Sequence, residues 1–187
     1  MGFYARPPED AFPERSARLA WLLVPLTLLF LALVLVLYVL NHPAKIDGAS
    51  MAPGLLHDDR VLVSRGYGVP KVGDIVEFEI DLPSGPERLI KRIVAVGGDT
   101  VTVVGDVVTV AGRPPLAASL RTSTAVWPDL SIDIRHGDVF VAGDNRPDSL
   151  DSRFFGPISR ESITGRVIIV ILPISRFQLV DASDGSG

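Results

Sequence analysis

Three short stretches of this 187-residue chain contain residue types that could do chemistry. Ser50 lies in "GASMAPGL" and Lys91 and Arg92 lie in "RLIKRIVAVGGD". Charges of both signs crowd "GDNRPDSLDSRFFGPI", from Gly143 to Ile158. A serine hydroxyl is a weak nucleophile until a base takes its proton. A lysine buried among apolar side chains can be that base, because burial disfavours the ammonium and lowers its pKa. These types therefore allow Ser/Lys nucleophilic catalysis.

Each stretch also has an ordinary structural interpretation. Ser50 with Pro53 three residues later is typical of a helix cap, and a lysine stem can lie along a sheet edge with its ammonium in water. The charged loop could be a structural Asp–Arg network. A calcium loop is excluded, because Arg146 falls where the third position needs an oxygen ligand and no Glu falls at the twelfth. At this point both the chemical and the structural interpretations stay open.

Composition removes several other kinds of site. The chain has no cysteine, which excludes disulfides, cysteine nucleophiles and thiolate metal sites. Its net charge is −4, without the basic excess expected of a nucleic-acid-binding protein. The three histidines, His42, His57 and His136, are scattered along the chain. We expect no metal, no cofactor and no nucleic-acid partner.

The elements that position these residues begin with an apolar run. Residues 20–40, "AWLLVPLTLLFLALVLVLYVL", contain no charge, and a helix of this length spans roughly 30 Å, the thickness of a bilayer core. Trp21 and Tyr38 lie near its ends, where aromatic rings prefer the membrane interface. A cleaved signal peptide would have a shorter apolar region followed by a small-x-small site, and "NHPAKI" offers none. The run predicts a retained transmembrane helix.

The basic residues around this run predict its orientation. Arg6, Arg15 and Arg18 precede it, and Lys45 is the first basic residue after it. By the positive-inside rule the N-terminus is cytoplasmic and the rest of the chain is exported across the cell membrane. The later apolar run from Val167 is too short for a second span.

After Leu40 the sequence is typical of a mostly β domain. Short β-branched runs bounded by Gly, Pro or Asp recur at 60–65, 74–80, 89–96, 100–104, 107–112, 138–143 and 165–171. Gly105-Asp106 predicts a hairpin, whereas residues 114–131 look irregular. We therefore predict a tail (1–19), a transmembrane helix (20–40), a β domain (41–180) and a disordered end (181–187).

Taken in order, the stretches resemble the motifs of type I signal peptidases, membrane-bound serine endopeptidases that remove signal peptides. The similarity runs from about Ala20 to Ile174. "SMAPGL" resembles the serine box S-M-x-P-T-L, "VGDIVEF" the strand box after it, "IKRIVAVGGDTV" the lysine box, and "GDNRPDSLDSRFFGPI" the last box, G-D-N-R-x-x-S-x-D-S-R-x-x-G. One box is weakly specific, but four in this order behind an apolar span identify the chain as a member of this family.

The resemblance implies a fold and a catalytic pair. The fold is a β-barrel-like catalytic domain behind a single transmembrane helix, with a smaller β-rich insertion at about 98–136. Ser50 is the implied nucleophile and Lys91 its general base. Ser149 is expected to hydrogen-bond the Lys91 amine and orient it.

The charged loop has a supporting role by the same resemblance. Asp151 and Arg153 are expected to form a salt bridge beneath the site. Asp144 and Arg146 are expected to hold the same loop. None of these four side chains should touch the bond that is broken.

The family cleaves after small residues at the first and third positions before the bond, often Ala-x-Ala. An extended substrate is expected to pair with strand edges near Ile46–Gly48 and Leu89–Ile90, with Met51 beside the nucleophile. The implied partners are preproteins that carry signal peptides, the lipid bilayer and, as a further candidate, the secretion translocase.

Two positions depart from the family pattern. Gly54 replaces the usual threonine, with little effect expected. Gly48 lies where some members have a serine whose hydroxyl helps bind the oxyanion, so here the Ser50 N–H remains as the donor, with a second amide or a water.

Three alternatives to a general signal peptidase remain at this stage. One is a Ser/Lys peptidase dedicated to a single partner, for example in pilin assembly. Another is an inactive anchored domain that only binds signal peptides, which the joint presence of Ser50, Lys91 and Ser149 disfavours. Self-cleaving repressors share the chemistry, but they need a DNA-binding domain where this chain has an apolar span.

Overall fold

The computed structural model describes residues 14–105, 107–113 and 129–180. The chain divides into two compact units, residues 1–39 and 40–187. The predicted disordered end at 181–187, the first thirteen residues of the predicted tail and residues 114–128 of the predicted insertion lie outside the described residues.

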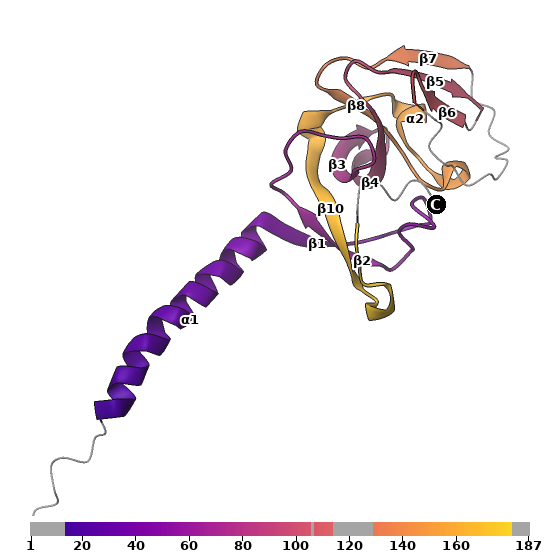
Figure 1. Ribbon diagram of the computed structural model, residues 1–187. Coiled ribbons are helices and arrows are strands. Elements are labelled where there is room, and N and C mark those ends of the chain that lie inside the picture. The colour runs from indigo at the N-terminus through magenta and orange to yellow at the C-terminus, as the bar shows by residue number, and fades with distance from the viewer. Residues whose placement is uncertain (1–13, 106, 114–128, 181–187) are drawn as a thin grey trace, which may run out of the picture. The chain divides into compact units, whose positions relative to one another are not determined.

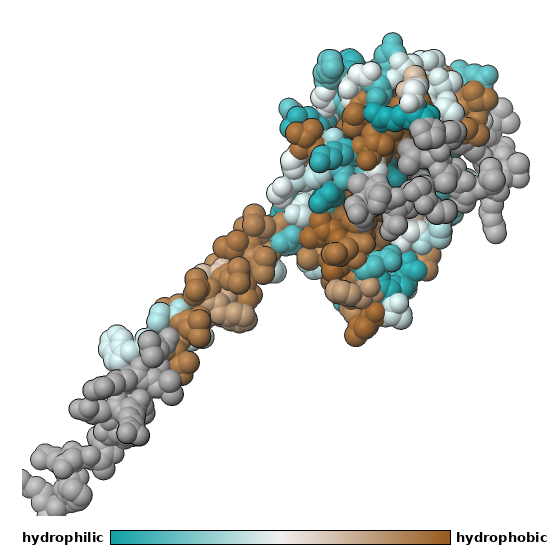
Figure 2. Space-filling view, viewed as in Figure 1, coloured by the Kyte–Doolittle hydropathy of each residue, from teal (hydrophilic) through white to brown (hydrophobic). Residues whose placement is uncertain are grey.

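The described residues of the first unit form the helix α1 (Glu14–Leu40) (Figure 1). It begins six residues before the predicted span and ends at the predicted residue. Residues Leu23–Leu40 have a mean hydropathy of 2.9, and the helix is long and apolar enough to cross a membrane. Trp21 and Tyr38 are exposed, as are the large apolar side chains between them that the structure describes (Figure 2). A helix that is apolar all round is suited to a lipid environment.

The second unit is built on an eight-stranded antiparallel sheet, which confirms the mostly β prediction. Its order is β1-β2-β10-β3-β4-β8-β9, with β11 paired to β10. The strands are β1 (Asn41–Lys45), β2 (Arg60–Ser64), β3 (Ile75–Leu82), β4 (Gly85–Val96), β8 (Asp138–Ala142), β9 (Ile158–Ser159), β10 (Ile163–Leu172) and β11 (Gln178–Leu179). Three of these, β1, β9 and β11, were not predicted.

A second, three-stranded sheet lies within the predicted insertion. It has the order β6-β5-β7, from β5 (Thr100–Val104), β6 (Val107–Val110) and β7 (Leu130–Asp133). The predicted hairpin joins β5 to β6, where Val104 pairs with Val107. The irregular stretch predicted to reach residue 131 ends earlier, because Leu130 and Ser131 pair with β5. Apolar residues of this small sheet pack against β4 and β8 in one core cluster.

Short helical turns complete the described part of the second unit. They are η1 (Arg146–Asp148), α2 (Ser152–Phe155), η2 (Arg160–Ser162) and η3 (Ile174–Arg176). Both η1 and α2 belong to the loop that follows β8. This loop is the charged stretch singled out in the sequence, and the sheet holds it beside the turn that carries Ser50.

Candidate active site

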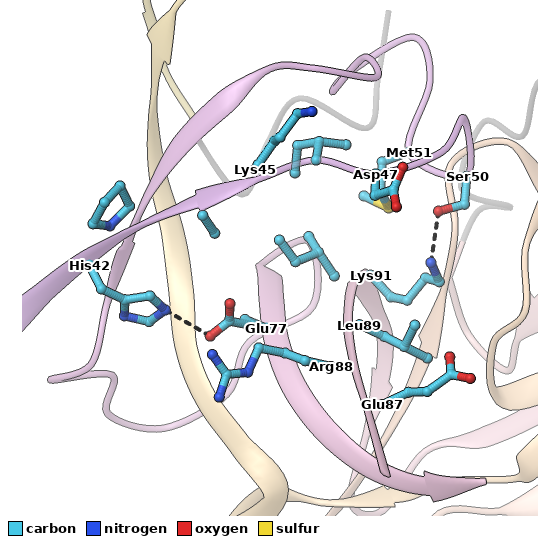
Figure 3. A pocket seen from close by; sticks show the side chains of 14 residues that line it. His42, Lys45, Asp47, Ser50, Met51, Glu77, Glu87, Arg88, Leu89 and Lys91 are labelled. Atoms are coloured by element: carbon cyan, nitrogen blue, oxygen red, sulfur yellow. Dashed lines mark hydrogen bonds and ion pairs between the residues drawn. The ribbon is translucent and has the colours of Figure 1, made fainter. Parts of the chain in front are cut away.

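Ser50 and Lys91 are 41 residues apart in the chain and meet in the structure. The Lys91 Nζ donates a hydrogen bond to the Ser50 Oγ at 2.7 Å (Figure 3). Lys91 lies in the middle of β4, opposite Val76 of β3. Ser50 lies in the turn that joins β1 to β2, so two separate elements of the sheet bring the pair together.

The turn that carries Ser50 is fixed by its own packing. Met51 and Leu55 are each 1% exposed and belong to a core cluster with strands β2 and β10. The Leu55 N–H donates to the Met51 carbonyl at 2.9 Å, and the Ala52 N–H donates to the Ala49 carbonyl at 3.1 Å. The nucleophile candidate therefore directly precedes two buried anchors on a short hydrogen-bonded turn.

The surroundings of Lys91 favour its neutral form. The side chain belongs to a residue that is only 4% exposed, and this burial lowers the pKa of the Lys91 amine. The carboxylates of Asp151, Asp144 and Asp148 act in the opposite direction, and burial has the larger effect. A lysine whose pKa is lowered can accept a proton from the hydroxyl beside it.

Arg92, the neighbour of Lys91, is buried as well. Its Nε and Nη2 donate to the two carboxylate oxygens of Asp144 at 2.8 and 2.7 Å, and its Nη1 donates to the Gly73 carbonyl at 2.9 Å. The two neighbouring cations, Lys91 and Arg92, are therefore both enclosed in the structure. Asp144 thus ties the charged loop to β4 through Arg92.

Asp151 is the centre of the charged loop and is fully buried. Arg153 donates to its two oxygens from Nε at 2.8 Å and from Nη2 at 3.0 Å, the salt bridge that the resemblance implied. The Gly143 N–H also donates to this carboxylate at 3.0 Å. Ser149 was expected to bond Lys91, but its hydroxyl donates to Asp151 Oδ2 at 2.7 Å instead. A buried carboxylate needs several donors, and Ser149 supplies one of them.

Arg146 contributes to the loop mainly through its backbone. Its carbonyl accepts a hydrogen bond from Arg153 Nη2 at 2.6 Å. Its guanidinium is buried, and Nε and Nη1 have no hydrogen-bond partner among the described residues. The expected role of Arg146 in holding the loop is therefore carried by its main chain in this structure.

A cleft of about 470 Å³ begins at the serine and the lysine and runs between β1 and β4. Figure 3 shows it from close by, with Glu77 of β3 hydrogen-bonded to His42 of β1 (2.9 Å) at the far end. Four residues expected to contact substrate line this cleft: Ile46, Met51, Leu89 and Ile90. The edge strand β1 lies opposite β4, two strands that are not neighbours in the sheet, so the sheet is strongly curled at this end.

Gly48 was expected to help bind substrate or oxyanion, but its N–H is used elsewhere. It donates to His57 Nδ1 at 3.0 Å. Gly48 has a φ of +83°, a left-handed conformation that suits glycine, and it is not among the residues that line the cleft. His57, which had no expected role, thus contacts the backbone two residues before Ser50.

Sequence reasoning also missed Asn145, although it lies inside the quoted charged loop. The Asn145 N–H donates to the Ser50 carbonyl at 3.0 Å, and its side-chain Nδ2 donates to the Ala49 carbonyl at 3.2 Å. The first residue of this loop, Gly143, packs closely enough on the same turn that an added Cβ would lie 2.5 Å from the Ser50 carbonyl oxygen. The charged loop and the serine turn therefore fit together without free space.

Residues 18–172 match the family model described as signal peptidase, peptidase S26. The chain belongs to this signal peptidase family. It is 32% identical over 164 residues to probable signal peptidase I-1 of Synechocystis sp., covering 82% of this chain and 83% of the relative. It is 31% identical over 140 residues to signal peptidase I of Leptolyngbya laminosa, covering 70% and 68%.

Among solved structures, signal peptidase I from Enterococcus faecalis V583 is 26% identical and matches with a TM-score of 0.42, covering 54% of this chain and 98% of that one. Membership of the signal peptidase family supports a peptidase activity. The apolar helix and the antiparallel sheets described above agree with this membership.

Proposed function

We propose that this signal peptidase is a membrane-anchored serine endopeptidase in which Ser50 is the nucleophile and Lys91 the general base. The observation that carries the proposal is the 2.7 Å contact between Lys91 Nζ and Ser50 Oγ in an enclosed site. A hydroxyl and a base within hydrogen-bond reach are the minimum for nucleophilic catalysis. The burial that lowers the pKa of Lys91 supplies the unprotonated amine.

The reaction begins when the neutral Lys91 Nζ accepts the Ser50 proton while Oγ bonds to the scissile carbonyl carbon. The carbonyl π electrons move to oxygen, which becomes an oxyanion near the Ser50 N–H. When the tetrahedral intermediate collapses, the C–N bond breaks and the protonated amine gives its proton to the leaving nitrogen. Lys91 next takes a proton from water while the water oxygen bonds to the ester carbon. As the C–Oγ bond breaks, the protonated amine returns its proton to Ser50 Oγ.

The substrate is a preprotein whose signal peptide lies extended in the cleft. The Ile46 N–H donates to the Asp59 carbonyl at 2.9 Å, and the Ile46 carbonyl accepts from the Asp58 N–H at 3.0 Å. Because backbone groups of successive strand residues point to opposite edges, the Asp47 N–H and carbonyl face the cleft. They are available to pair with an added strand, with cleavage after small-x-small sequences as the resemblance implies.

The opposite wall of the cleft offers a second free edge. Residues 85–92 of β4 pair with β3 on one side, whereas β8 pairs with β4 only from Arg92 onwards. Among the residues that the structure describes, the segment that holds Leu89 and Ile90 therefore has an unpaired edge beside Lys91. A peptide between this edge and Asp47 would bring its carbonyl to Ser50.

The helix α1 anchors the enzyme in the cell membrane, with the N-terminus cytoplasmic and the catalytic unit on the other side. Confinement of enzyme and signal peptide to one bilayer raises their effective concentration. The secretion translocase is the implied source of the preprotein. The positive-inside pattern of the N-terminal arginines supports this orientation.

The experiment is cleavage of a secretory precursor by detergent-solubilised protein, with sequencing of the new N-terminus. Ser50→Ala and Lys91→Met should each abolish cleavage, and methionine keeps the buried volume filled. Ser131→Ala and Lys71→Ala change exposed residues of the same types and should cleave normally. Full turnover by either Ser50→Ala or Lys91→Met would refute the assignment. Cleavage of one precursor alone, among several offered, would favour a dedicated peptidase.

A further inference from the structure

Asn145 holds the nucleophile's backbone from both sides. Its N–H donates to the Ser50 carbonyl at 3.0 Å, and its side-chain Nδ2 donates to the Ala49 carbonyl at 3.2 Å. These two carbonyls belong to the peptide groups that precede and follow Ser50. Asn145 therefore fixes the orientation of both peptide planes around the reacting residue, although it touches neither Oγ nor the Lys91 amine.

The side-chain contact has a consequence for the Ser50 N–H. The Ala49–Ser50 peptide is trans, since the described cis peptides are at Ala52-Pro53 and Leu172-Pro173. In a planar trans peptide the N–H points opposite to the carbonyl. A donor that fixes the direction of the Ala49 carbonyl therefore also fixes the direction of the Ser50 N–H.

This N–H is free to bind a ligand. Over the part of the chain that the structure describes, it donates to no protein acceptor, and Ser50 lines the cleft. Gly48 cannot share the task, because it has no hydroxyl and its own N–H is bonded to His57. The oxyanion thus depends on one well-aimed donor from this turn.

We propose that Asn145 is a positioning residue that aims the Ser50 N–H at the oxyanion through the Ala49 carbonyl. The proposal rests on the proposed Ser50 chemistry. A hydrogen bond accepted by the carbonyl also polarises the peptide group, which strengthens its N–H as a donor. Both effects act on the charge that develops in the transition state, where an aimed donor is most valuable.

The structure allows this contact to be removed alone. Asn145→Ala deletes Nδ2 but keeps the backbone N–H that holds the Ser50 carbonyl, so the two loops stay docked. Removing a direct oxyanion donor costs about 10²–10³ in kcat. Here the donor remains, and the Ala52 N–H still holds the Ala49 carbonyl at 3.1 Å. We therefore expect kcat to fall about tenfold with KM unchanged, since the interaction acts in the transition state only.

Binding of a peptide aldehyde distinguishes a misaimed Ser50 N–H from a general distortion of the cleft. In the complex Ser50 Oγ bonds to the aldehyde carbon, the proton passes to Lys91, and the aldehyde oxygen becomes an oxyanion. Asn145→Ala should weaken aldehyde binding about tenfold and leave binding of the matching product peptide unchanged. The midpoint of the kcat/KM–pH profile should stay that of the wild type, because the Ser50–Lys91 contact is untouched.

Asn145→Asp tests the same contact with an isosteric side chain whose carboxylate cannot donate to a carbonyl, and it should also lose kcat. Leu150→Ala, at an exposed position of the same loop, is the control and should behave as wild type. Unchanged kcat and aldehyde affinity in Asn145→Ala and Asn145→Asp would overturn the proposal while Ser50→Ala remained inactive. Equal weakening of aldehyde and product peptide would do the same, since it would indicate a distorted cleft. An active Ser50→Ala would instead overturn the proposed function itself.

Discussion

Gly143 is where the charged loop and the serine turn come closest, and Gly143→Ala is the sharpest test of their fit. A Cβ at this position would lie 2.5 Å from the Ser50 carbonyl oxygen and would clash more severely with the Ser149 hydroxyl. To reach an ordinary contact of about 3.4 Å, the two loops must separate by about 0.9 Å. Neither loop can yield cheaply, because Met51 is buried on one side and Asp151 on the other.

The expected cost follows from that displacement. A misplacement of about 1 Å in an active site lowers the rate by about 10²-fold, and overpacking a tight contact destabilises a fold by roughly 1–3 kcal/mol. Gly143→Ala should therefore lose about a hundredfold in kcat/KM and melt several degrees lower. Gly66→Ala is the matched control, because an added Cβ there meets nothing within 4 Å.

The assay is kcat/KM on a short Ala-x-Ala peptide together with thermal melting of both variants. A Gly143→Ala enzyme with wild-type kcat/KM and wild-type melting would refute the argument that the two loops have no space between them. A loss of the same size in Gly66→Ala would show that the effect is general to glycine replacement.

Three further predictions concern the catalytic pair and its support. Burial lowers the pKa of Lys91, and its neutral form is the proposed base. On the same peptide, kcat/KM should therefore rise from neutral into alkaline pH with a slope of about one on a log scale, at pH values below the roughly 10.4 of a free lysine. A rise in kcat/KM centred near pH 6.5 would indicate a histidine instead. The Ser50→Ala/Lys91→Met double variant should be no slower in single-turnover cleavage than either single variant, since the two residues act as a unit; additive losses would contradict this. Asp151→Ala should lower melting temperature and turnover together, because it leaves Arg153 buried without its carboxylate; normal melting with lost turnover would point to a direct chemical role.

Much of this architecture is readable from residue patterns, for reasons that are local. The β-branched runs at residues 100–104 and 138–142 form strands with almost the predicted bounds, since their alternation and their Gly or Asp boundaries specify strand ends. The apolar span likewise ends at Leu40 as predicted. The pairing of Ser50 with Lys91 was reached through motif order, because no local pattern brings together residues 41 positions apart.

What escaped prediction depends on tertiary contacts. β1 was not among the predicted strands; it contains Pro43, which a strand tolerates at the edge of a sheet. The Ser149 hydroxyl donates to the buried Asp151 carboxylate, a contact that the order of the motifs does not indicate. The contacts of Asn145 with the serine turn require two loops 96 residues apart to meet, which no spacing in the sequence indicates.

The direct connection of α1 to β1 also limits the length of chain between the apolar span and Ser50. Leu40 ends the helix and Asn41 begins β1, so no linker residue lies between these two elements in the chain. Ten residues lead from Leu40 to Ser50, and an extended chain of that length reaches at most about 35 Å. With α1 as the proposed membrane anchor, the proposed nucleophile can lie no farther than this length of chain from the end of the apolar span. A precursor whose scissile bond is held farther out than this by a long spacer should escape cleavage, however well its residues fit the cleft.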